Sequence, residues 1–397
     1  MKSYVLVVLM TGLAATAAAN TILSVGTPGE PAAAVDARAL GMGGAALALA
    51  DGSNLNGLNP AVWASLKRAG FNLTAVRGYN SYETAQGKSV NVNYDVPGVE
   101  IALPAAENLT VAFSFREKLN QNYEVTAPLE FGGERIGTSE RRGVGGLYAL
   151  RLGAARRLSA RWLAGLNAGY DFGAPEEVYT KTFTEKGYSD VQERLATSYR
   201  GVGGALGIVW LTDDHLSFGA AAELYARHSC REETSNDYVT LIESDHQVDL
   251  PYAGGVGAAY IFGPRARAAL DVRYTAWSGF RVDGVGQGFR DTVEVRAGAE
   301  GRINAGRKGF FLWRMPYRCG AFYAPWYGRD YGTYTAFGVT AGAGYLFQNN
   351  EDSRFDAAFE YVRRGSAATA VREEQMNFYI SVVGVETWFG KQQEEGE

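Results

Sequence analysis

The residues that could do chemistry are few, and they form no complete catalytic set. The three histidines, His215, His228 and His246, are scattered, and the chain has no Cys/His cluster with metal-ligand spacing. The only two cysteines, Cys230 and Cys319, cannot frame a fold of 397 residues. We therefore expect a protein that is not an enzyme, with no cofactor and no metal site.

The stretch ARALGMGGAALALADGSNLNGLNPA, residues 37–61, holds another chemical candidate. Gly41, Gly43 and Ala46 match the loose pattern of a dinucleotide-binding loop, but such a loop must follow a strand, and the preceding GEPAAAVDARAL is not one. A membrane helix also fails, because only residues 39–50 are uncharged and apolar. We interpret the stretch as a compact plug, in which Gly and Ala permit close backbone approach and Pro60 ends the helical part.

The elements that would surround such a plug are indicated by composition. The chain has 50 Gly, 23 Tyr, 19 Phe and 7 Trp, which favours tight turns and strands over a helical enzyme. Lys and Arg number 38 against 43 Asp and Glu, so the strongly basic face of a nucleic-acid-binding protein is not expected.

Lys2, the apolar run after it and the small residues 17–19 predict a signal peptide over 1–19.

Hydrophobic residues recur with a period of two. In AALDVRYTA, residues 268–276, the side chains of Leu270 and Val272 share one face, whereas Asp271 and Arg273 lie on the other. The same alternation predicts about fourteen strands, at 71–82, 89–103, 109–126, 142–155, 160–173, 198–211, 215–229, 248–262, 266–277, 291–303, 316–326, 333–347, 353–363 and 376–389. On this map Cys230 and Cys319 lie near opposite ends of their strands, which predicts two free thiols.

Alternation of this kind also fits a soluble β-sandwich, so the lengths of strands and connections are needed to distinguish a sandwich from a membrane barrel. Strands of about 10 to 15 residues suit a tilted bilayer crossing. Short turns alternate with long polar segments at 174–197, 230–247 and 278–290, which we expect to be external loops. Aromatic residues near strand ends fit interfacial girdles: Trp162, Trp210, Trp277, Trp326, Tyr327, Trp388 and Phe389.

We therefore predict an all-β fold, a transmembrane antiparallel β-barrel of about fourteen strands over 70–390. An N-terminal hatch over 20–69 would plug it, and residues 391–397 would be a polar tail. The charged face of the strands should line the lumen: Asp171, Glu223, Arg227, Asp271, Arg273, Glu294, Arg296, Glu300, Arg302, Asp356 and Glu360. Arg38 and Asp51 of the hatch are candidate partners for these charges.

The hatch segment resembles that of the FadL/TodX-type transporters of hydrophobic compounds, and it is similar to that of the related PorV-type barrels. The residues that carry the resemblance are Arg38, Gly41, Gly43, Gly44, Asp51, Asn59, Pro60 and Ala61. The resemblance implies a monomeric fourteen-stranded barrel in the outer membrane of a Gram-negative-type bacterium, in contact with membrane lipid. It also implies a hatch that closes the lumen and a small hydrophobic ligand or detergent molecule within it.

Two functions follow from this resemblance, beside the alternative of a purely structural barrel. The first is a channel for the uptake of small hydrophobic molecules. The second is a PorV-like, non-transporting barrel that docks secreted or surface proteins. The polar segments 174–197 and 230–247 and the charged lumen depart from an acyl channel, whose entrance should expose a large apolar patch.

Overall fold

The computed structural model describes residues 21–32, 36–84, 87–184, 187–213, 215–236, 242–304, 310–329, 332–347, 350–365 and 369–386. The predicted signal peptide and polar tail, together with Trp388 and Phe389, lie outside these ranges. No helix within them is long and apolar enough to cross a membrane.

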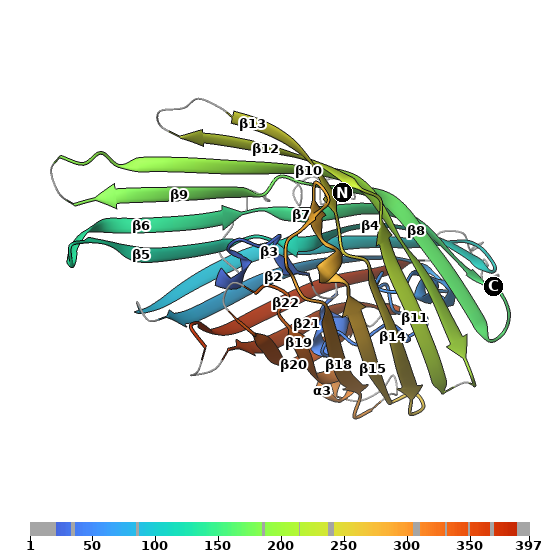
Figure 1. Ribbon diagram of the computed structural model, residues 1–397. Coiled ribbons are helices and arrows are strands. Elements are labelled where there is room, and N and C mark those ends of the chain that lie inside the picture. The colour runs from blue at the N-terminus through green and yellow to red at the C-terminus, as the bar shows by residue number, and fades with distance from the viewer. Residues whose placement is uncertain are drawn as a thin grey trace, which may run out of the picture.

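Fourteen antiparallel strands close into a ring, which confirms the predicted fold class (Figure 1). In ring order they are β2 (Ala69–Thr84), β3 (Gly87–Ala106), β4 (Leu109–Asn120), β7 (Gly146–Arg157), β8 (Trp162–Gly173), β10 (Val191–Leu211), β11 (Leu216–Tyr225), β14 (Ala253–Ile261), β15 (Ala266–Thr275), β18 (Thr292–Gly301), β19 (Tyr317–Pro325), β20 (Thr335–Phe347), β21 (Asn350–Arg364) and β22 (Arg372–Glu386). The ring closes because β22 pairs with β2 along its length, from Ala69 opposite Glu386 to Glu83 opposite Arg372.

The alternation read from the sequence gives the ring an apolar outer face and a polar inner face. On β15, Leu270 and Val272 are exposed on the outer face, whereas Asp271 is fully buried. A barrel in lipid needs this arrangement, since apolar side chains face the acyl chains and every backbone group pairs within the ring. Cys319 lies on the exposed outer face of β19, Cys230 is buried on another strand, and both thiols are free.

The connections differ at the two ends of the ring. At the short-turn end, where β2 begins and β22 ends, turns such as 107–108, 158–161 and 262–265 join neighbouring strands. The connection from β18 to β19 at this end carries α3 (Phe311–Arg314). The opposite, long-loop end carries the extra strands and the segment 276–291, with η3 (Trp277–Gly279), β16 (Arg281–Val282) and β17 (Val285–Gly286).

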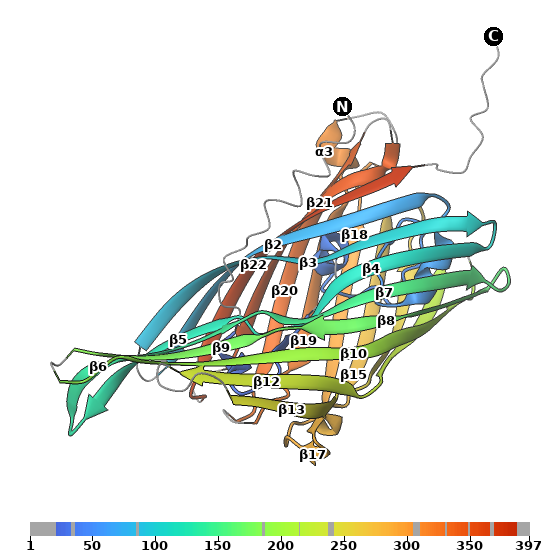
Figure 2. The same ribbon diagram turned by 90° about the horizontal axis from the view of Figure 1, so that it is seen from above.

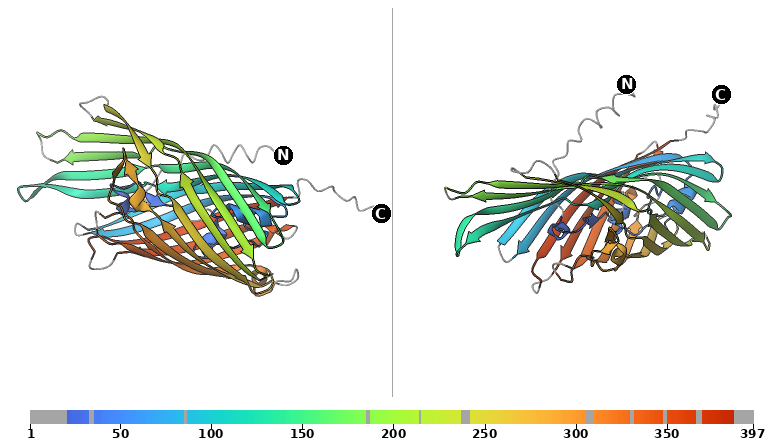
Figure 3. Two further views of the ribbon diagram at one scale, coloured as in Figure 1. Left: turned by 45° about the vertical axis from the view of Figure 1, so that its right-hand side comes forward. Right: turned by 45° about the horizontal axis from the view of Figure 1, so that its top comes forward.

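A sheet continues the ring beyond the long-loop end. It contains β5 (Tyr123–Phe131), β6 (Glu134–Val144), β9 (Glu176–Phe183), β12 (His228–Asn236) and β13 (Ile242–Asp249), together with residues 191–200 of β10. We call these six strands the outer sheet. It projects well past the ring in Figures 1 and 2, and Figure 3 shows the projection from two further sides.

The outer sheet corrects part of the sequence interpretation. Much of the segments 174–197 and 230–247, expected to be loops, forms β9, the outer part of β10, β12 and β13. The expected strand 109–126 is divided, because β4 ends at Asn120 and β5 begins at Tyr123. These segments contain residues of high strand propensity, such as those of EEVYTKTF, but polar residues lie on both faces, so apolar alternation does not reveal them.

The ring is incomplete between β3 and β4 in its outer half. Pairing of β3 with β4 begins at the short-turn end and stops at Gly98 opposite Arg116. Further along β4, its free edge pairs with the hatch strand β1 (Glu30–Pro31), which lies opposite Leu119 and Asn120. The hatch therefore supplies the neighbour that β4 lacks in the wall.

Candidate functional site

The N-terminal segment, which we call the hatch, runs through the inside of the ring. Its elements are η1 (Ile22–Ser24), β1, α2 (Ala37–Gly41) and η2 (Pro60–Ser65). Residues of η1 join a buried cluster at the long-loop end, α2 lies against β20 and β21, and η2 lies against β7 and β8. The hatch therefore spans the lumen between its two ends.

Asn59, Pro60 and Ala61 fix the last hatch element to the wall. The Asn59 side chain caps η2 by accepting a hydrogen bond from the Ala61 backbone N–H at 3.0 Å, and Pro60 occupies the first position of η2. Asn59 Nδ2 donates to the backbone oxygen of Leu47 at 2.8 Å and to that of Ile208, on β10, at 3.2 Å. These contacts give the three residues a structural role in capping and anchoring the hatch.

Gly43 and Gly44 allow the hatch backbone to touch the wall. Both have positive φ angles, +67° and +81°. A Cβ atom on Gly43 would lie 2.7 Å from the backbone oxygen of Ala297 and 2.8 Å from that of Ala321. Only glycine fits here, since the left-handed conformation and the close approach both exclude a side chain.

Seven charged side chains form one chain of ion pairs between hatch and wall: Arg38, Asp51, Arg267, Glu300, Arg318, Arg354 and Asp356. Arg38 on α2 is its centre. Its Nη2 lies 2.5 Å from Asp51 Oδ2 in the hatch, and its Nε lies 2.9 Å from Glu300 Oε2 on β18. Arg267 on β15 pairs with both carboxylates.

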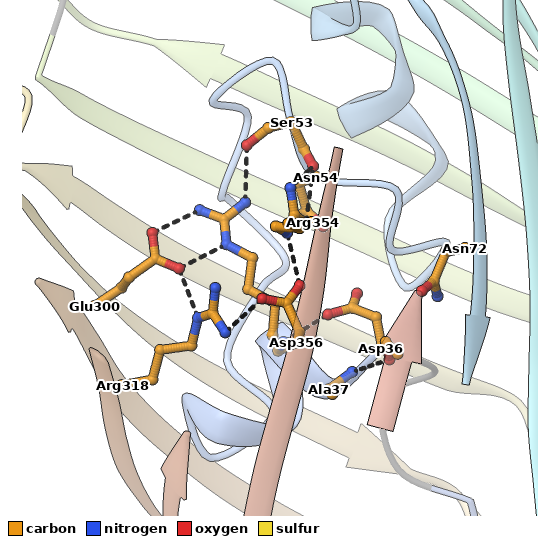
Figure 4. A network of polar contacts seen from close by, with 12 residues as sticks. Asp36, Ala37, Ser53, Asn54, Asn72, Glu300, Arg318, Arg354 and Asp356 are labelled. Carbon is orange, nitrogen blue, oxygen red and sulfur yellow. Dashed lines mark hydrogen bonds and ion pairs between the residues drawn. The ribbon is translucent and has the colours of Figure 1, made fainter. Parts of the chain in front are cut away.

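The ion-pair chain continues along the wall and returns to the hatch (Figure 4). Arg318 Nε donates to Glu300 Oε2 at 2.7 Å, and Arg318 Nη1 lies 2.8 Å from Asp356 Oδ1. Arg354 Nε donates to Asp356 Oδ2 at 2.6 Å, and both Nη atoms of Arg354 donate to the backbone oxygen of Ser53 at 3.2 Å. Removing one member of such a buried pair costs about 3–5 kcal/mol, because its partner is left uncompensated.

Asp51 shows the electrostatic effect of this arrangement on the hatch. Burial raises the pKa of Asp51, but the positive charges of Arg38 and Arg267 outweigh burial and hold the pKa of Asp51 below its ordinary value. The carboxylate therefore remains charged at neutral pH and keeps the hatch attached.

Three more predicted lumen charges hold the hatch by its backbone. Asp271 Oδ2 accepts hydrogen bonds from the N–H groups of Ala46, at 2.8 Å, and Leu47, at 3.1 Å. Arg273 donates to the Gly44 oxygen at 2.5 Å, and Arg296 donates to the Gly43 oxygen at 3.1 Å. The wall therefore satisfies backbone groups of an irregular segment that would otherwise be buried without partners.

Other predicted lumen charges pair within the wall. Asp171 Oδ1 lies 2.5 Å from Arg151, and Asp171 Oδ2 lies 3.2 Å from His228. Glu223 pairs with Arg116 and Lys118.

The last four members of the predicted set differ in their positions. Glu294 pairs with Arg296, and Glu360 accepts a hydrogen bond from Asn377. Arg302 follows the end of β18 at the short-turn end. Arg227 departs from the expectation: it follows the end of β11, its side chain is 61% exposed, and it pairs with Asp249 rather than lining the lumen.

An aromatic cap closes the long-loop end above the hatch. Ile22 and Leu23 of the hatch pack there with buried aromatic residues of the long connections: Trp277, Phe280, Phe289, Trp326, Tyr327 and Tyr334. The rings of Trp277 and Tyr327 stack with centroids 3.7 Å apart. This corrects the expectation for Trp277, Trp326 and Tyr327, which are buried in the cap rather than placed in a lipid girdle, whereas Trp162 and Trp210 stack on the exposed outer face.

Two small cavities remain between hatch and cap, and their linings mix apolar and charged residues. One cavity of about 180 Å³ has Lys118, Glu223 and Arg273 in its lining. A neighbouring cavity of about 140 Å³ is lined in part by Glu117 and Arg296. Ligand pockets for drug-sized molecules typically have volumes of about 300–1,000 Å³, so neither of these two cavities offers much room for an apolar ligand.

Sequence reasoning missed several residues that attach the hatch. Arg267, Arg318 and Arg354 were not among the predicted lumen charges, although Arg267 shares the phase of Asp271 and Arg354 shares that of Asp356. Both lie within the predicted strands 266–277 and 353–363, so carrying the alternation to the first residues of each strand would have found both. The aromatic cap left no comparable signal, because its residues come from irregular connections.

The fold is that of outer-membrane channels for hydrophobic compounds. A Pseudomonas aeruginosa FadL homologue matches with a TM-score of 0.67 at 12% identity, over 89% of this chain and 99% of that chain. The CymD monoaromatic hydrocarbon channel matches with a TM-score of 0.58 at 15% identity, over 89% and 98%. The Pseudomonas putida toluene transporter TodX matches with 0.58 at 14%, over 91% and 99%.

These matches confirm the resemblance of the fold to the FadL/TodX type, and at such low identity they concern the fold alone. CymD is named as a channel and TodX as a transporter, not as enzymes, and the β-barrel fold of this chain is consistent with an outer-membrane location. The chain itself belongs to the BamG family, whose family model matches residues 2–394. No curated protein matches its sequence.

Proposed function

We propose that this protein is a closed outer-membrane barrel that binds protein partners through its outer sheet. The observation that carries the proposal is the outer sheet itself, six strands that continue past a ring whose lumen is filled. A barrel that only conducts a solute needs strands long enough to cross the bilayer. The additional sheet provides a surface outside the membrane.

The tips of the outer sheet have the chemistry of a protein-binding surface. Each of its three hairpins exposes an apolar side chain at or near the turn: Phe131 is 74% exposed, Tyr188 55% and Ile242 57%. Large exposed apolar residues on an otherwise polar surface mark interaction sites, and aromatic residues are frequent anchors of interfaces. The strand β5 also pairs with β6 alone among the described strands. Tyr82 and Asn91 donate hydrogen bonds to the Glu124 oxygen near the start of its other edge, so the part beyond Glu124 is the candidate for strand addition.

The filled lumen supports the same proposal. The ion-pair chain and the aromatic cap lie across the path that a transported molecule would take. Opening the path would break several buried ion pairs, and each broken pair costs several kcal/mol of free energy.

Triple replacement of the tips tests the proposal. The variant Phe131→Ser, Tyr188→Ser, Ile242→Ser removes the apolar side chains without touching the ring. Proteins cross-linked in cells to the tagged wild-type barrel should be lost from this variant. They should be retained by Leu158→Ser, which changes a 61% exposed apolar residue at the short-turn end. An unchanged set of cross-linked proteins in the tip variant contradicts docking through the outer sheet.

Uptake of small hydrophobic molecules is the second candidate function. Two observations favour it, the likeness of the fold to hydrocarbon channels and the break between β3 and β4, at which β1 pairs with β4. Cells that carry the protein should then take up a labelled long-chain fatty acid or toluene faster than cells that lack it, and the tip variant should not change the rate. Equal rates with and without the protein argue against this candidate.

A further inference from the structure

The short-turn mouth of the barrel contains a cavity with an excess of positive charge. This mouth cavity has a volume of about 380 Å³, and seven basic and two acidic residues are among its lining. Four of the basic residues belong to the ion-pair chain, whose three carboxylates are Asp51, Glu300 and Asp356. The other three are Lys67, Arg68 and Arg302, and because Arg68 has a further partner, about three positive charges remain in excess.

Arg302 lines the mouth cavity with a donor that has no hydrogen-bond partner. Its Nε atom is buried and has no hydrogen-bond partner, and no ion pair joins its guanidinium to a carboxylate of the described residues. Burial lowers the pKa of Arg302. The charge of Glu300 opposes this, while those of Arg267, Arg38 and Arg318 lower the pKa further. A buried donor without a partner in a positive field is an unfavourable arrangement that an anion would relieve.

Lys67 provides a second cation at the same mouth. It lies just after η2, is exposed, and forms no ion pair with a described carboxylate. Its flexible side chain can reach a ligand in the mouth cavity without distorting the wall. The cavity is therefore flanked by cations from the hatch, from the segment after η2 and from the wall.

We infer that the mouth cavity binds a phosphate group. A phosphate carries up to two negative charges and several acceptor oxygens, and the planar guanidinium fork of arginine matches its geometry. A single carboxylate would leave most of the excess charge in place. The group can come from the headgroup of a membrane phospholipid, since the mouth lies at one edge of the ring, or from a soluble phosphate.

Titration calorimetry on the purified full-length protein in a neutral detergent tests this site. The probes are inorganic phosphate and dihexanoyl phosphatidylglycerol below its micelle concentration. Arg302→Gln should weaken binding about tenfold or more, because hydrogen bonds to charged groups are among the stronger ones. Lys67→Gln should weaken it a few-fold, because exposed charges contribute less.

Arg265→Gln is the matched control, because Arg265 is exposed at the same end and does not line the mouth cavity. It should bind the probes as the wild type does, and heat-modifiable mobility on a gel should show that all three variants are folded. Binding of inorganic phosphate assigns the site to the free ion, and binding of the lipid probe alone assigns it to a headgroup. The inference is overturned if neither probe binds, if Arg302→Gln binds like the wild type, or if acetate binds as tightly as phosphate.

Discussion

Replacing Glu300 with Gln tests whether the ion-pair chain holds the hatch in the barrel. Glu300 on β18 accepts hydrogen bonds from Arg38 of the hatch at 2.9 Å and from Arg318 of the wall at 2.7 Å, and its other oxygen lies 3.2 Å from Arg267. Glutamine keeps the size and one acceptor oxygen of the side chain but removes the charge. Three buried guanidinium groups would then share the remaining carboxylates.

The size of the effect follows from the burial of these groups. Breaking a buried ion pair by removing one partner costs about 3–5 kcal/mol. At about 1.4 kcal/mol for each factor of ten, the detached state of the hatch should become roughly a hundred- to several-thousand-fold more populated. The ring should remain folded, because its strands keep their backbone hydrogen bonds with one another.

Hydrogen–deuterium exchange of the folded protein measures this population. Peptides from residues 36–65 should exchange faster in Glu300→Gln, while peptides from β20 and β21 should not change. Glu360→Gln is the control, because Glu360 is a buried lumen carboxylate whose hydrogen bonds come from Asn377 and Tyr379 of the wall. Equal hatch exchange in the two variants would refute the reasoning and show that packing, not charge, attaches the hatch.

Two further predictions concern local geometry. Gly43→Ala should destabilise the attached hatch by about 2–4 kcal/mol, through left-handed backbone strain and a clash with the wall. Gly52→Ala should cost only the strain, because its added Cβ would lie 3.4 Å from the nearest atom. Hydrogen–deuterium exchange of the hatch measures both effects. The hydrogen bond to Asp283 raises the pKa of His246. The contact of β13 with the β16–β17 turn should therefore be fully stabilised by this bond below about pH 6.5, and it should lose the stabilisation as pH rises through the raised pKa. Amide exchange in this turn, corrected for the intrinsic rate, should show the loss in the wild type and not in Asp283→Asn.

The ring could be predicted because lipid imposes a simple rule on every strand. Side chains that face acyl chains must be apolar and those that face the lumen need not be, so β15 and β18 show the alternation plainly. Each of the fourteen predicted strands corresponds to a strand of the ring. The outer sheet has no such rule, because polar residues lie on both faces of strands such as β9 and β12 and few of their side chains are buried. Apolar alternation therefore predicts loops there rather than strands.

The attachment of the hatch was only partly predictable, for a different reason. The hatch motif predicted charged partners for Arg38 and Asp51, and the alternation along β18 predicted that Glu300 faces the lumen. The partner of each charge depends on the stagger of all fourteen strands and on the path of the hatch between them. Contacts separated by 262 residues, as between Arg38 and Glu300, have no local signal.

Deletion of residues 41–61 tests whether the hatch fills the lumen. The ring strands keep their pairing, so the barrel should assemble, and charges such as Asp271, which now hold the hatch backbone, should be hydrated instead. Fourteen strands enclose more space than their own side chains fill, so a water-filled pore should appear as lasting conductance in planar bilayers that the wild type lacks. Ile22 and Leu23 remain in the aromatic cap of this variant, so a longer deletion of residues 21–61 separates the two barriers. Conductance in the longer deletion alone would show that the cap closes the long-loop end by itself, and a folded barrel that conducts in neither deletion would show that the hatch does not block the lumen.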